Sequence, residues 1–145
     1  MRSFWMYLVV ASFVFSGGLV FAGSQALASV SVTVSKGQQR MHVYVNGALR
    51  HVWKVSTGRG RYVTPSGTFR PKRLERSWYS RKYDDAPMPY SIFFYGGYAI
   101  HGTSHVRALG RRASHGCVRL RTRNAARLFS LVRRYGAGRT RISIN

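Results

Sequence analysis

The chain has 145 residues, a length that allows one domain of ordinary size and excludes two. It contains 24 lysine and arginine residues against 3 aspartate and glutamate residues, so its formal net charge is +21, yet its hydrophobic content of 45% excludes a disordered polycation. The single cysteine excludes an internal disulfide and a four-cysteine zinc site, and the acids, Glu75, Asp84 and Asp85, exclude a mechanism built on paired carboxylates far apart in the sequence.

The N-terminal segment has the three-part pattern of a secretory signal peptide. Arg2 precedes an apolar stretch over 4–22, and a small-residue site of the A-x-A type follows at 26–28. An uncleaved anchor is the alternative, because the apolar stretch approaches the ~20 residues that a membrane span needs. A glycine-containing break in the apolar stretch favours a signal peptide over 1–28. We therefore expect an exported domain over 29–145.

Strands are expected to dominate the domain. Alternating apolar and polar side chains, many of them β-branched, predict strands over 30–34, 41–45 and 49–55. Asn46-Gly47 is a strong hairpin signal, because both turn positions favour residues that tolerate positive φ. Further strands are expected over 68–70, 90–95, 98–100 and 139–144, with a second hairpin turn at Gly96-Gly97.

The segment 70–89 breaks this pattern. It is polar, it holds three of the four prolines and all three acids, and it shows no clear period. These features predict a long loop over the domain. Loops of this length are uncommon unless they are functional.

One helix is expected late in the chain. It begins with Thr122 as the N-cap and ends before Gly136. Its apolar face is made by side chains at helical spacing, which are Ala125, Leu128, Phe129 and Val132. Strands with a single amphipathic helix predict a mainly β fold, a small sandwich or open barrel with the helix packed against it.

The residues able to carry chemistry are concentrated in HGTSHVRALGRRASHGCVRL, residues 101–120. A thiol attacks as the thiolate and needs an imidazole or another cationic group nearby. His115 lies two residues before Cys117 and His101 lies sixteen before it. A loop return would bring His101 to the thiol in better geometry, so we assign His101 as the base. Gly116 permits a tight backbone, and amides near Cys117 could form an oxyanion hole.

This segment resembles the signature of the L,D-transpeptidase catalytic domain family, the bacterial peptidoglycan cross-linking enzymes. The resembling motifs are H-G-T, S-H-G-C-V-R and, upstream, the T-P-S-G-T-F run at 64–69. The resemblance implies a β-sandwich of mixed sheets with one C-terminal amphipathic helix. It also implies a cysteine that attacks the bond between diaminopimelate and D-alanine in a tetrapeptide stem, and an acyl group that passes to an acceptor amine.

Carried over by motif, the resemblance gives each residue a role. Cys117 is the nucleophile, His101 is the general base, and the Gly102 carbonyl orients the imidazole. The Gly116 and Cys117 amides form the oxyanion hole. The expected substrate-binding residues are Arg119, Ser114, His115 and Tyr98, with Tyr90 as a further candidate for the donor channel. The resemblance implies no metal and no cofactor, and a location in the periplasm or cell wall.

Several alternatives remain open on the sequence. An L,D-carboxypeptidase or a protein-to-peptidoglycan attachment enzyme would share the acyl-enzyme and differ in the acceptor. His101, His105, His115 and Cys117 also have the residue types of a zinc site. A sortase-like enzyme would use His, Cys and Arg in the same order, but with a wider histidine spacing and without S-H-G-C. A basic module that only binds anionic polymers would leave the motif unexplained.

The expected partners follow from export and from the positive charge. We expect peptidoglycan stem peptides at the site and anionic cell envelope polymers on the basic surface, with no nucleic acid. A monomer is assumed.

Overall fold

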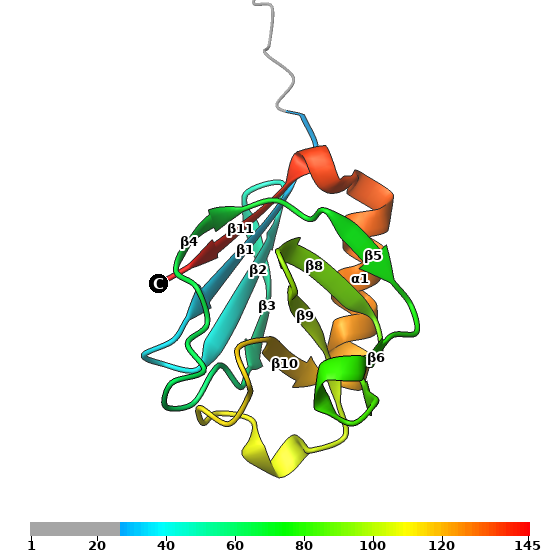
Figure 1. Ribbon diagram of the computed structural model, residues 1–145. Helices are drawn as coiled ribbons and strands as arrows, with labels where there is room; N and C mark the ends of the chain where they lie inside the picture. The colour runs from blue at the N-terminus through cyan, green and yellow to red at the C-terminus, as the bar shows by residue number, and fades with distance from the viewer. Residues whose placement is uncertain (1–26) are drawn as a thin grey trace, which may run out of the picture.

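The computed structural model describes residues 27–145, so the predicted signal peptide lies, except for its last two residues, outside the described residues. In the range 27–145, no helix is both long enough and apolar enough to cross a membrane. Two sheets and one helix surround a common core (Figure 1).

The first sheet has five strands in the order β3-β2-β1-β11-β4. Their bounds are β1 Val30–Ser35, β2 Arg40–Val45, β3 Ala48–Lys54, β4 Gly67–Phe69 and β11 Thr140–Ile144. β1 and β11 run parallel and the other neighbours run antiparallel. The β2–β3 hairpin turns at Asn46 and Gly47, whose φ angles are +51° and +78°. Both angles lie in the left-handed region that this dipeptide predicts, so the hairpin is confirmed.

The second sheet has four strands in the order β10-β9-β8-β5. Their bounds are β5 Arg73–Glu75, β8 Ser91–Tyr95, β9 Tyr98–Thr103 and β10 Val118–Arg121. β9 and β10 are parallel, in the register Ile100 to Val118 and His101 to Arg119. Since successive side chains of a strand point to opposite faces, this register directs Ile100 and Val118 into the core. It directs His101 and Arg119 to the other face.

The helix α1 (Thr122–Tyr135) closes the core at one side, and its predicted apolar face is buried as expected. Its N-terminus differs from the prediction, because the N-cap is Arg121 and makes no side-chain capping bond. Thr122 is the first helical residue, and its hydroxyl instead donates to the Thr103 carbonyl at 3.4 Å. Gly136 ends the helix with φ +91°, as its position predicts.

The prediction of one long loop over 70–89 is wrong in part. β5 lies inside this segment and forms the edge of the second sheet. The rest contains a short hairpin of β6 (Tyr79–Ser80) and β7 (Ala86–Pro87), which flanks a 3₁₀ turn at Arg81–Tyr83. Strands of two or three residues are too short to show an alternating pattern, which is why the sequence did not reveal them. β10, which has four residues, was also not predicted.

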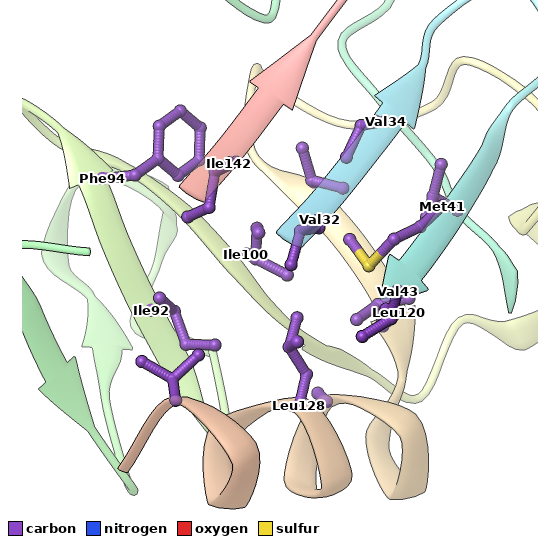
Figure 2. Close-up of a cluster of buried hydrophobic side chains, with 14 of the residues drawn as sticks. Val32, Val34, Met41, Val43, Ile92, Phe94, Ile100, Leu120, Leu128 and Ile142 are labelled. Atoms are coloured by element: carbon purple, nitrogen blue, oxygen red, sulfur yellow. The ribbon is translucent and has the colours of Figure 1, made fainter. Parts of the chain in front are cut away.

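The core lies between the two sheets and α1 (Figure 2). Val32 and Ile142 come from the first sheet, Ile92 and Ile100 from the second, and Leu128 from the helix (Figure 2). All five side chains are almost completely buried. One packed cluster therefore fixes the second sheet and the helix relative to the first sheet.

Leu128→Ala should lower the free energy of unfolding by about 2 to 5 kcal/mol, because it leaves a cavity where both sheets meet the helix. Urea denaturation followed by circular dichroism measures the change. Ser130→Ala on the exposed face of the same helix is the matched control and should change stability by less than about 0.5 kcal/mol. Equal effects of the two variants would contradict the assigned core.

Candidate active site

The predicted nucleophile and base come together through the β9–β10 pairing. Cys117 directly precedes β10, and continuing the observed register by one residue places it beside Ala99 of β9. His101 is two residues farther along β9 on the same face, so the two Cα atoms are roughly 8 Å apart. The two residues are sixteen positions apart in the sequence, and the parallel pairing of β9 and β10 brings them close in space.

Both side chains line one cavity of about 900 Å³. Arg119, His115 and Tyr98 line it as well. Much of the remaining wall comes from the segment 73–88, which covers the site from the side of β5, β6 and β7. The cavity therefore lies on the face of the second sheet that points away from the core.

His101 is held as a neutral imidazole with a defined tautomer. The residue is only 6% exposed, and its Nδ1 lies 2.7 Å from the Gly102 carbonyl oxygen. Since a carbonyl only accepts hydrogen bonds, Nδ1 carries the proton and Nε2 is left as the basic atom. Burial lowers the pKa of His101 from 6.5 to about 4; the bond to Gly102 raises it and the charge of Arg119 lowers it further.

Cys117 is held as a neutral thiol. It is the only free cysteine and is partly exposed, with Sγ 4.0 Å from the Gly97 carbonyl oxygen. Burial raises the pKa of the thiol, while a backbone hydrogen bond with Ala99 and the charge of Arg119 act in the opposite direction. A neutral thiol and a neutral imidazole therefore line the same cavity, and an attack by this thiol would require transfer of its proton to a base such as Nε2.

Ser114 shapes the backbone around the thiol. The residue is completely buried. Its hydroxyl donates to the Cys117 carbonyl at 2.6 Å and accepts from the Gly116 amide at 3.1 Å. Ser114 was expected to bind substrate; its side chain is hydrogen-bonded within the loop and does not line the cavity.

Gly116 has a steric role that no other residue could fill. Its φ is +115°, and a Cβ atom there would lie 2.7 Å from Cε1 of Tyr98. The Gly116 amide donates to Ser114, so it is not free to stabilise an oxyanion as expected from the sequence. Of the two amides considered, that of Cys117 remains as the candidate oxyanion donor.

Thr64 helps to position the loop that carries Cys117, a role that the sequence did not predict. It is buried, and its hydroxyl donates to the Gly116 carbonyl at 2.8 Å while accepting from the Gly58 amide at 2.9 Å. The T-P-S-G-T-F motif that begins at Thr64 was the available signal. Its first residue ties the segment after β3 to the loop that carries Cys117.

Aromatic rings surround His115 at the mouth of the cavity. Tyr83 stacks on the imidazole with ring centres 4.5 Å apart and an interplanar angle of 16°, and Tyr62 meets it edge-on at 4.6 Å. Burial and the charges of Arg59 and Arg119 lower the pKa of His115. Tyr90 was expected in the donor channel, but its ring packs against Phe129 of α1 at 5.7 Å and does not line the cavity.

Arg119 brings a partly buried positive charge into the cavity that Cys117 and His101 line. Its backbone exchanges hydrogen bonds with Ser56 at 2.8 and 3.0 Å, and its Nη1 donates to the Ala113 carbonyl at 3.5 Å. Burial lowers the pKa of the guanidinium, which nevertheless stays charged. The side chain can bind a carboxylate of a ligand in the cavity.

The segment 73–88 contributes wall residues that the sequence did not identify individually. Trp78 and Met88 form a small apolar cluster with Phe93 and Ala99, against which Cys117 packs. The signal was present as aromatic and apolar residues inside an otherwise polar segment. No group of three or more His, Cys, Asp or Glu side chains suited to a metal ion occurs within 27–145.

The depressed pKa of His101 makes a prediction about stability. Between its ordinary value of 6.5 and about 4, the unfolded chain binds a proton at this residue that the folded chain does not bind. The free energy of unfolding should therefore fall as the pH is lowered through this window, by up to about 1.4 kcal/mol per pH unit from this group.

Urea denaturation at a series of pH values tests this prediction. His101→Gln should have a shallower pH dependence than the wild type, and His105→Gln, at an exposed histidine, should keep the wild-type slope. Parallel curves for the wild type and His101→Gln would refute the assignment of a buried neutral imidazole.

Known proteins share this sequence pattern and fold. The chain matches the model of the L,D-transpeptidase catalytic domain, YkuD, over residues 29–144. YqjB of Bacillus subtilis (strain 168) is 26% identical over 114 residues, in an alignment that covers 70% of this chain and 65% of YqjB.

Solved structures agree with the predicted fold class. An L,D-transpeptidase from Mycobacterium smegmatis superposes with a TM-score of 0.71 at 22% identity, over 81% of this chain and 59% of that chain. L,D-transpeptidase 3 from Mycobacterium tuberculosis, in complex with a faropenem-derived adduct, has a TM-score of 0.71 at 21% identity, over 81% of this chain and 60% of that chain. This chain spans less than two thirds of the length of these relatives. By its match over nearly the whole described region, the chain belongs to the L,D-transpeptidase catalytic domain family.

Proposed function

We propose that this domain is a peptidoglycan L,D-transpeptidase in which Cys117 is the nucleophile and His101 is the general base. The observation that carries the proposal is the shared cavity, which is lined by the single cysteine and by a histidine whose Nδ1 is bound to a carbonyl. L,D-transpeptidase 3 from M. tuberculosis was solved in complex with a faropenem-derived adduct, which supports a reactive site in this family.

The first half of the proposed reaction forms an acyl-enzyme. Nε2 of His101 takes the thiol proton, and Sγ of Cys117 attacks the carbonyl carbon between diaminopimelate and D-alanine. The Cys117 amide stabilises the oxyanion. The C–N bond then breaks, and the proton held by His101 passes to the nitrogen of the departing D-alanine. A thioester between Cys117 and the stem remains.

In the second half, an acceptor amine attacks the thioester carbon and loses a proton to His101. The amide forms, the C–S bond breaks, and the proton returns to the thiol. An L,D-carboxypeptidase would use water as the acceptor, and a protein-attachment enzyme would use a protein lysine. We favour the stem amine, and product analysis separates the three.

The test is incubation of the purified protein with disaccharide-tetrapeptides, followed by mass spectrometry. Dimers joined between two diaminopimelate residues are expected, with loss of D-alanine. Cys117→Ala should reduce product formation by more than about 10³-fold, because it removes the nucleophile. His105→Gln changes a cavity-lining histidine outside the proposed mechanism and should retain activity.

Other products would change the conclusion in defined ways. Tripeptides alone would indicate the carboxypeptidase. Full activity of Cys117→Ala, or no product of either kind from the wild type, would overturn the proposal.

We also propose that the basic surface retains the domain on anionic polymers of the cell envelope. Arg123, Arg127 and Arg134 are exposed on the outer face of α1. All three acids of the chain lie within the segment 73–88 that covers the cavity, so α1 contains no acidic residue. A face with this charge attracts carboxylate and phosphate groups over about one Debye length.

Binding to isolated cell walls should weaken steeply as the salt concentration rises. Changing Arg123, Arg127 and Arg134 to glutamine should lower the salt concentration needed for release, while turnover of soluble disaccharide-tetrapeptides stays the same. Cosedimentation in a sodium chloride series measures the release. Retention that does not change with salt concentration would contradict electrostatic binding.

A further inference from the structure

The wall of the cavity carries an arginine whose position is fixed by its neighbours. Arg73 lies on the edge strand β5, in register with Phe93 of β8. Its guanidinium carbon lies 4.0 Å from the centre of the Phe93 ring and 4.4 Å from that of Trp78. Its Nη1 donates to the Glu75 carboxylate at 3.0 Å. Two cation–π contacts and one ion pair therefore hold the group in place.

Most of the donor capacity of this guanidinium is unused by the protein. A guanidinium has five N–H donors in a planar fork. Glu75 is the one acceptor for Arg73 among residues 27–145. The side chain remains 45% exposed and lines the same cavity as Cys117. The unused N–H groups can donate two hydrogen bonds to one carboxylate, in bidentate fashion.

Arg73 is aligned with the nucleophile across the sheet. Phe93 pairs with Ala99 of β9, and Cys117 lies beside Ala99 on the other side. The guanidinium lies over Phe93, which is two strand spacings, roughly 10 Å, from the position of Cys117. A peptide that is acylated at Cys117 and extends along this row reaches Arg73 with between two and three residue lengths, at about 3.3 to 3.6 Å per residue.

The charges of the cavity favour an anionic peptide along this row. Arg81, Lys82 and Arg119 line it together with Arg73, and Asp84 is the one acid in the lining. In a tetrapeptide stem, the γ-linked glutamyl residue precedes diaminopimelate. Its α-carboxylate lies between two and three residue lengths from the carbonyl carbon that the thiol attacks, roughly 8 Å when the chain is extended. That separation is about 2 Å shorter than the distance from Cys117 to the Phe93 position under Arg73, and a hydrogen bond of about 3 Å to the guanidinium covers the difference.

We propose that Arg73 binds the free α-carboxylate of the glutamyl residue in the donor stem, and that the enzyme therefore selects stems with this carboxylate over stems in which it is amidated. The inference rests on the proposed function, since it concerns the donor of that reaction. Arg73 then determines specificity through a charged hydrogen bond that an amide cannot replace.

The test compares two synthetic disaccharide-tetrapeptides that differ only in a free or amidated glutamyl α-carboxylate. For the full chain, kcat/KM should be about tenfold higher on the free acid. Arg73→Gln should lose this preference by losing activity on the free acid while keeping its activity on the amide, which also shows that the variant is folded.

Arg76→Gln is the matched control, because it removes the same charge from the same segment. Arg76 lies near Tyr90, 5.9 Å from its ring centre, and does not line the cavity. It should keep the wild-type preference.

Four outcomes would overturn the inference. A wild type without preference, or an Arg73→Gln variant with the wild-type preference, would remove the role of Arg73 and leave the proposed function standing. An equal loss of preference in Arg76→Gln would assign the effect to net charge. No product from either stem with the wild type would overturn the proposed function and the inference with it.

Discussion

The parallel pairing of β9 with β10 is the constraint on which the rest of the site depends. One register brings His101 opposite Arg119 and Cys117 beside Ala99. The same register sends Ile100, Val118 and Leu120 into the core between the sheets and the helix. A slip of one residue would exchange the two faces, so that the apolar side chains would point into the cavity and the reactive ones into the core. Core packing thus fixes the geometry of the reactive face.

A small set of buried hydrogen bonds supports this pairing where the strand begins. Ser114 bonds to both Gly116 and Cys117, and Thr64 bonds to the Gly116 carbonyl. Ser114 and Thr64 are buried, so their hydrogen bonds would be costly to leave unmade. These hydrogen bonds therefore fix the conformation of the loop before β10. The serine and glycine of the S-H-G-C motif therefore hold the backbone of Cys117 in position, and neither lines the cavity.

The sequence predicted those parts of the molecule whose cause is local. The β2–β3 hairpin follows from two residues that tolerate positive φ, and α1 follows from four apolar residues at helical spacing. The assignment of His101 to Cys117 came from the need of a thiol for a base and from an expected loop return, and the resemblance agreed with it. The parallel pairing of β9 with β10 was not predicted, because no local pattern states which strands are neighbours. The walls of the cavity were not predicted, because β5, β6 and β7 are too short to show a period. The burial of Ser114 was not predicted, because a sequence does not state burial.

The protonation state of Cys117, the proposed nucleophile, affects how fast the thiol is oxidised. Oxidation of a cysteine by peroxides proceeds through the thiolate, so a thiol with a raised pKa reacts slowly. The single cysteine of this chain has no second cysteine that could reduce it or pair with it after oxidation. In the proposed mechanism the thiolate forms as His101 takes the proton, so the raised pKa of Cys117 would limit the exposure of the thiolate to oxidants between turnovers.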